Sequence, residues 1–269
     1  MMKSTLLRFF AISGVAVAVT GCVSDQKAAQ VKLEQQAVLG LNWVQQSGEY
    51  QALAYQAFNT ARRAFDAAKA QNGHKKAVIV DLDETMIDNS AYAAWRVEHG
   101  VPYTKPTWAR WMEAKQATAI DGAVSFARYV NSYGGRMFYI SNRDDTSYAA
   151  TVENLQKLGF PGVSRETVLL RTTQSNKQAR FDRVKSKGYD VVVYIGDNLN
   201  DFGTACYGKN NRERRLQVAA QQKQFGSKFI MLPNPNYGDW ISGMATDYYK
   251  QTPVRQLEIN RENLRVWKD

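Results

Sequence analysis

Short apolar runs alternate with amphipathic segments along most of this chain. The apolar runs are rich in Val, Ile, Leu and aromatic residues and have the length of buried strands, at 77–80, 136–140, 168–170, 191–195 and 229–232. Between them, apolar residues recur every three or four positions, which predicts helices at 121–133, 148–158 and 176–186. Strands that alternate with helices form βαβ units. We therefore expect an α/β fold with a doubly wound parallel sheet.

Two further amphipathic patterns precede the first strand, at 33–44 and 54–68, and Gly48 separates them. They predict N-terminal helices that pack on the sheet. After the first strand, residues 92–112 are rich in aromatic side chains, and proline interrupts them twice. This segment is too long for a turn and has no strand pattern, so we expect a small helical cap around residues 90–118.

The N-terminus differs from the rest of the chain. Lys3 and Arg8 precede an apolar run at 9–19, which is too short for a convincing membrane-spanning helix and is typical of a secretory signal. We expect residues 1–21 to be a signal peptide.

The residues Val19-Thr20-Gly21-Cys22 resemble a bacterial lipobox, which implies lipid attachment to Cys22. Residues 22–32 are small and polar and predict a flexible lipidated tether, followed by one domain at 33–269. Val23 stands where an inner-membrane retention signal would have Asp, so an outer-membrane location is favoured. An ordinary signal peptide with an incidental cysteine is the alternative.

The net charge of the chain indicates which kinds of binding partner are expected. The chain has 35 Lys and Arg against 25 Asp and Glu, a net charge of +10. No helix-turn-helix, finger or RNA-binding signature accompanies this charge, so we expect small anionic substrates and a membrane surface as partners, and no nucleic acid. Cys206 has no intramolecular partner if Cys22 carries lipid, so we expect no disulfide.

Acidic residues follow two of the predicted strands. Asp81 and Asp83 come directly after the run at 77–80, and Asp197 and Asp201 follow the run at 191–195. Carboxylates that meet at the carboxyl ends of parallel strands repel each other unless a cation is bound or a proton is shared. Oxygen ligands predict Mg²⁺, and the two histidines, His74 and His99, do not have a metal-like spacing.

Two other polar residues complete this pattern: Ser141 follows the run at 136–140, and Lys177 opens the helix predicted at 176–186. The set of Asp-x-Asp-x-Thr, Ser, Lys and a pair of acids resembles the haloacid-dehalogenase-like phosphohydrolases. Together with the segment Leu232–Gly238 and the N-terminal helices, it resembles the bacterial class C acid phosphatases of the outer-membrane lipoprotein e type.

This resemblance implies a magnesium-dependent phosphomonoesterase. The carboxylates of Asp81 and Asp197 and the backbone carbonyl of Asp83 would hold the metal, and Asp201 would orient a water ligand. Asp81 would form an aspartyl-phosphate, and Asp83 would act as general acid and base. Ser141 and Lys177 would bind the phosphoryl oxygens.

The resemblance also implies nucleoside 5'-monophosphates, among them nicotinamide mononucleotide, and aryl phosphates as substrates, with a role in nucleotide salvage. Trp108 and Tyr237 match positions where this family places rings around the leaving group, and Ile87 and Asn89 follow the first motif closely enough to line the pocket. The alternative for Trp108 is a place in the cap's own small core. A rival class of function is a haem- or ligand-binding lipoprotein with a vestigial fold, and a homodimer remains open.

Overall fold

The computed structural model describes the backbone of residues 16–268 and the side chains of residues 25–268. Most of the predicted signal peptide, including Lys3 and Arg8, lies outside the described residues, as does the side chain of Cys22. No helix in the described part of the chain is both long and apolar enough to cross a membrane.

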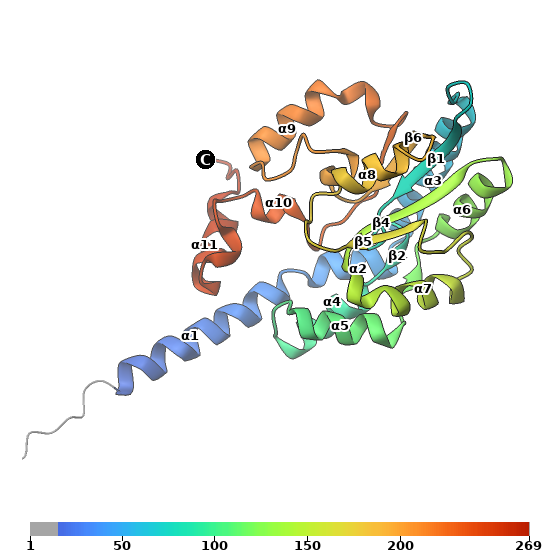
Figure 1. The fold of residues 1–269 in the computed structure, drawn as a ribbon. Helices are drawn as coiled ribbons and strands as arrows, with labels where there is room; N and C mark the ends of the chain where they lie inside the picture. Colours follow the sequence, from blue (N-terminus) through green and yellow to red (C-terminus); the bar gives the residue numbers. More distant parts are fainter. Residues whose placement is uncertain (1–15, 269) are drawn as a thin grey trace, which may run out of the picture.

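The centre of the molecule is a five-stranded parallel sheet with the order β5-β4-β1-β6-β7 (Figure 1). Its strands are β1 (Lys75–Val80), β4 (Arg136–Asp144), β5 (Val168–Arg171), β6 (Tyr189–Gly196) and β7 (Phe229–Met231). The chain first adds β4 and β5 on one side of β1 and then β6 and β7 on the other. The prediction of a doubly wound parallel sheet is therefore confirmed.

Both faces of the sheet are buried, which explains why its strands are continuous apolar runs. Successive side chains of β1 point to opposite faces, so Val78 and Val80 lie in one apolar cluster and Ala77 and Ile79 in the other. The first cluster also contains residues of three helices, α3 (Gly48–Ala67), α6 (Ala123–Ser132) and α7 (Tyr148–Lys157). The second cluster contains residues of α8 (Gln178–Lys185).

The cap predicted around 90–118 consists of two helices, α4 (Ser90–His99) and α5 (Lys105–Ala114). Thr104 caps α5 and Pro106 lies in its first turn, where a proline costs no hydrogen bond. A short antiparallel pair, β2 (Ile87–Asp88) and β3 (Thr118–Ala119), joins both ends of the cap at its base. The sequence did not predict this pair, because a strand of two residues is too short to show an alternation of apolar and polar positions.

The N-terminal helices are α1 (Ala16–Gln35), α2 (Val38–Gln46) and α3, and Ser47 caps α3. The prediction of a flexible tether at 22–32 differs from the structure, in which these residues belong to α1. The segment contains no Pro or Gly after Gly21, and Ala29 is buried. The helix α1 also contacts the C-terminal helix α11 (Pro253–Glu262), an element whose weak pattern gave no prediction. Tertiary packing thus orders a segment whose composition alone suggests a linker.

The remaining helices lie between β6 and the C-terminus: α9 (Asn211–Ala220) and α10 (Asp239–Ser242). A 3-10 turn at Leu199–Phe202 follows β6 directly and shapes the loop that carries the second pair of acids.

Candidate active site

The candidate site lies at the carboxyl end of β1, where the strand order reverses between β4 and β6. A crevice forms outside the strand ends at such a switch point, and ligands bind there in open α/β sheets. The turn after β1 is tight: the carbonyl of Leu82 accepts hydrogen bonds from the amides of Thr85, Met86 and Ile87, and Glu84 has a φ of 57°. Asp81 directly precedes this turn and Asp83 lies within it, so the turn sets the positions of both carboxylates.

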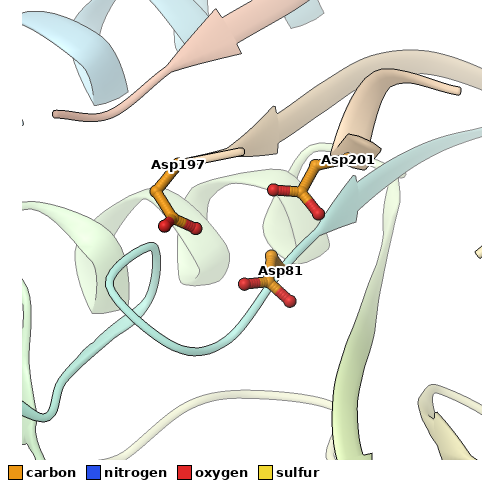
Figure 2. A group of neighbouring side chains, drawn as sticks. All are labelled: Asp81, Asp197 and Asp201. Atoms are coloured by element: carbon orange, nitrogen blue, oxygen red, sulfur yellow. The ribbon is translucent and has the colours of Figure 1, made fainter. Parts of the chain in front are cut away.

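Three carboxylates converge at this point (Figure 2). Asp81 follows β1, Asp197 follows β6, and Asp201 lies in the 3-10 turn; one oxygen atom of each lies within 4.8 Å of the others. The amide of Asn198 donates to Asp201 Oδ2 at 3.0 Å. Any Cβ at Gly196 would collide with the carboxyl group of Asp201, so only glycine permits this approach.

Lys177 lies beside this cluster, immediately before α8, and its side chain is 5% exposed. Its Nζ donates to Asp81 and, at 2.7 Å, to Asp201. Burial alone would lower the pKa of Lys177, but Asp201 and Asp81 outweigh it and raise the pKa above its usual 10.5. Lys177 was predicted to bind phosphoryl oxygens, and this role stays a prediction; its partners in the structure are the carboxylates of Asp81 and Asp201.

The three carboxylates are costly to ionise together. Burial raises the pKa of Asp81 from 3.8 to about 7, against the opposing charge of Lys177 and with a further contribution from Asp201. Burial, followed by Asp201 and Asp81, raises the pKa of Asp197 well above its usual value. Three carboxylates and one ammonium group would leave two negative charges. This oxygen-only donor set therefore fits a divalent cation, as the sequence predicted.

Asp83 is not part of the cluster of three carboxylates and has partners of its own. Its Oδ1 accepts hydrogen bonds from Asn89 Nδ2 at 2.9 Å and from Arg143 Nη2 at 2.8 Å. Its Oδ2 accepts from Ser141 Oγ at 3.2 Å. Asp83 therefore forms an ion pair with Arg143. The carboxylates that the sequence predicted near it are also present, because burial raises the pKa values of Asp81 and Glu84 and the charge of Asp83 contributes to the rise.

Arg143 and Asn234 are site residues to which sequence reasoning gave no role. Arg143 lies two residues after Ser141 on β4, and its side chain is 1% exposed. Asn234 Nδ2 donates to Asp197 Oδ2 at 2.8 Å, and its Oδ1 accepts from the amide of Tyr237 at 3.3 Å. Their only signal in the sequence was their position, two residues after Ser141 for Arg143 and inside the segment Leu232–Gly238 for Asn234.

The four predicted pocket residues have different positions. Trp108, on α5, is half-buried and packs edge-on against Tyr92 at 5.1 Å, so it belongs to the cap's own aromatic cluster. It also faces Arg143, whose Cζ lies 5.5 Å from the ring centroid. Tyr237 is 38% exposed in the loop after β7.

Asn89 and Ile87 lie at the base of the cap. Asn89 is buried, contacts Asp83 and accepts a hydrogen bond from Trp111 Nε1 at 2.8 Å. The side chain of Ile87 is fully buried in the apolar cluster that contains Val78 and Val80. Its position is thus in the core, which corrects the expectation of a pocket wall.

Comparison with known proteins points to one family. The family model of the HAD superfamily, subfamily IIIB (acid phosphatase), matches residues 6–240. The class C acid phosphatase from Bacillus anthracis superposes with a TM-score of 0.83 at 37% identity, covering 88% of this chain and 100% of that one. Its structure with tungstate bound gives the same TM-score at 36% identity and the same coverage.

The curated relatives are more distant. Acid phosphatase 1 of Solanum lycopersicum is 25% identical over 131 residues, 46% of this chain and 51% of that protein. The stem 31 kDa glycoprotein of Glycine max is 23% identical over 180 residues, 62% of this chain and 59% of that protein. The chain therefore spans about half to three fifths of the length of these two proteins.

Proposed function

Because this chain belongs to subfamily IIIB of the HAD superfamily, the acid phosphatases, we propose that it is a metal-dependent phosphomonoesterase whose nucleophile is Asp81. The observation that carries this proposal is the arrangement at the end of β1. Asp81 lies among two further carboxylates and a buried lysine. Asp83, which also follows β1, has separate partners. This division suits a nucleophile and a proton donor with different surroundings.

In the first step, a carboxylate oxygen of Asp81 attacks phosphorus, and the bond to the ester oxygen breaks. Asp83 gives its proton to that oxygen as it leaves. In the second step, Asp83 accepts a proton from the water that hydrolyses the aspartyl-phosphate, so one residue serves as acid and then as base. Nearby donors, the hydroxyl of Ser141 and the ammonium of Lys177, would stabilise the phosphoryl oxygens. The tungstate in the Bacillus anthracis structure supports an oxyanion site in this fold.

We propose that the metal is Mg²⁺, held by Asp81, Asp197 and the backbone carbonyl of Asp83, with Asp201 orienting a water ligand. When bound, the cation neutralises charge on the nucleophile and on the phosphate, so that the two anions can approach. Thr85 Oγ1 and Asn234 Nδ2 both donate to Asp197, at 3.1 and 2.8 Å, and fix this ligand's direction. Such outer partners orient metal ligands in general.

We propose that the substrates are phosphate esters with flat leaving groups, namely nucleoside 5'-monophosphates and aryl phosphates. The support for this proposal is the presence of two aromatic side chains on which such a group could stack. Trp108 and Tyr237 lie on segments anchored to different parts of the site: Trp108 faces the Asp83 partner Arg143, and the loop of Tyr237 is tied to Asp197 through Asn234. Removing phosphate from nucleotides for nucleoside uptake, at an outer membrane to which Cys22 anchors the protein, is the role we propose.

Nothing in the described structure favours the rival function of haem binding. His74 Nδ1 pairs with Asp190 at 2.8 Å, at the amino end of β1 and thus opposite the carboxylates. His99 packs against Trp95 with ring centroids 4.6 Å apart, and its Nδ1 contacts the Trp95 carbonyl.

The proposed function is tested by hydrolysis of p-nitrophenyl phosphate and of a nucleoside monophosphate at several pH values. We expect turnover that a chelator abolishes and Mg²⁺ restores, because the carboxylate cluster needs a cation. Full activity in exhaustively metal-free buffer would exclude the metal-dependent mechanism, and no turnover of any phosphomonoester would exclude the function.

A further inference from the structure

Arg143 is a buried charged residue to which the reaction described above assigns no part. It follows Ser141 by two residues on β4, and both side chains reach Asp83. Burying a guanidinium is strongly unfavourable unless it is paired and hydrogen-bonded. The contacts of the Arg143 guanidinium should therefore show which groups compensate for its burial.

The guanidinium is held at several points. Its Nε donates to Asp83 Oδ1 at 2.9 Å, and its Nη2 donates to the same oxygen at 2.8 Å. Nη2 also lies 3.2 Å from Asn89 Oδ1, and Nη1 lies 3.3 Å from Thr151 Oγ1. A planar fork with partners on three sides has one orientation, and it imposes that orientation on the carboxylate it binds.

The same guanidinium connects Asp83 to the cap. Its Cζ lies 5.5 Å from the ring centroid of Trp108, within the range of a cation–π contact. Asn89, which also donates to Asp83, accepts a hydrogen bond from Trp111 at 2.8 Å. Two tryptophans of α5 thus contact two of the three side chains that hold Asp83.

We propose that Arg143 is a positioning residue for Asp83, and that it couples the cap to the proton transfer. This inference rests on the proposed function. When the ester bond breaks, its electron pair goes to the leaving oxygen, which takes the proton of Asp83, and the carboxylate formed on Asp83 is stabilised by Arg143. In the second step water bonds to phosphorus, its proton returns to Asp83, and the electron pair of the phosphorus–oxygen bond returns to Asp81.

The test compares leaving groups, because protonation matters most for an oxygen that is unstable as an anion. For wild type, Arg143→Gln and Arg143→Lys, kcat/KM is measured with glycerol phosphate, an alkyl ester, and with p-nitrophenyl phosphate, whose leaving group is stable as an anion. Arg165→Gln is the matched control, since Arg165 is an exposed arginine paired with Asp145. The ratio of the two values does not depend on the folded fraction of a preparation.

We expect Arg143→Gln to lose about 100-fold or more on glycerol phosphate, the range of general acid catalysis, and less than about 10-fold on p-nitrophenyl phosphate. Arg143→Lys, which keeps the charge but not the fork, should show a smaller change in the ratio, and Arg165→Gln none. Equal losses on both substrates, or failure of both Arg143 variants to fold, would overturn the inference while leaving the function intact. A wild-type protein inactive on both would overturn the function itself.

Discussion

Asp81 and Asp83 are separated by one residue, yet their side chains have different partners. Asp81 lies with Asp197, Asp201 and Lys177, whereas Asp83 is held by Arg143 and its neighbours. Asp81 precedes the tight turn after β1, and Asp83 lies within it. Two equivalent carboxyl groups thereby acquire the separate surroundings that a nucleophile and an acid–base group require.

The metal assignment predicts the behaviour of Asp197. Asp197→Asn removes one charged ligand but keeps the side chain's size and its position after β6. We expect the Mg²⁺ concentration for half-maximal activity, and for half-maximal stabilisation against heat, to rise by about 100-fold or more. Asp190→Asn is the control, because Asp190 lies at the other end of β6 and pairs with His74. An unchanged Mg²⁺ dependence would remove Asp197 from the metal site.

The sequence predicted the acids but not the residues that orient them. The carboxylates follow predicted strands, and Lys177 opens a predicted helix, so their positions could be matched to the motifs of the family. Arg143 and Asn234 act through contacts with residues 60 and 37 positions away along the chain, respectively. Arginine and asparagine side chains are mostly exposed to solvent, so only the folded chain reveals these buried partners.

At the scale of elements, two segments outside the sheet and the helices packed on it approach the site from different sides. The cap helix α5 brings Trp108 to the side of β4, and the loop after β7 carries Tyr237 and is tied to Asp197 by Asn234. Such segments give a shared catalytic centre its substrate preference.

Tyr237→Ala tests whether this loop recognises a flat leaving group. We expect kcat/KM for a nucleoside monophosphate to fall by about 10-fold or more, because one stacking contact is worth about 1–3 kcal/mol. The change for glycerol phosphate should be slight, since phosphate contacts are common to both substrates. Tyr133→Ala, which removes an exposed ring at the end of α6, is the control. Equal losses on both substrates would mean that base recognition lies elsewhere.

The elements that could be predicted are those with a long apolar pattern: the strands, the helices packed on them and the aromatic cap. The strand β4 is longer than its apolar run, because Ser141–Asp144 continue it with polar residues that bind Asp83 and pair with β5. The two-residue strands β2 and β3 depend on the turn after β1, and the helical state of residues 22–32 accompanies packing of α1 against α11 and α4. These features depend on contacts between residues far apart in the sequence, and the local pattern of apolar and polar residues gives no information about such contacts.

At the scale of the whole molecule, the carboxylate cluster links metal binding to stability. The folded protein raises the pKa of Asp81 from 3.8 to about 7, so between these values it binds more protons than the unfolded chain, and metal-free stability falls as pH rises. A cation bound to the ionised cluster, as we propose, would restore that stability. We expect Mg²⁺ to raise the Tm of chelator-stripped protein more at pH 7 than at pH 5. An equal or larger shift at pH 5 would contradict this account of the site.

The anchor proposal concerns how the whole molecule is located. Cys22→Ser should prevent lipid attachment and leave the protein unprocessed or soluble, as shown by the mass of the protein and by its partition between membrane and soluble fractions. Cys206→Ala is the control, because Cys206 is buried and lies far along the chain from the lipobox-like segment. Unchanged membrane partition of an exported Cys22→Ser protein would contradict the lipobox interpretation.

The most direct test of the central claim is to trap the covalent intermediate. Wild-type protein is mixed with excess p-nitrophenyl phosphate, quenched in acid during turnover and reduced with borohydride, which converts an aspartyl-phosphate to homoserine. Peptide mass spectrometry should then find homoserine at position 81, and Asp81→Asn should keep the fold, give no homoserine and turn over about 1,000-fold more slowly or not at all. A phosphoryl group on another residue, or an Asp81→Asn protein within about tenfold of wild-type activity, would contradict the account.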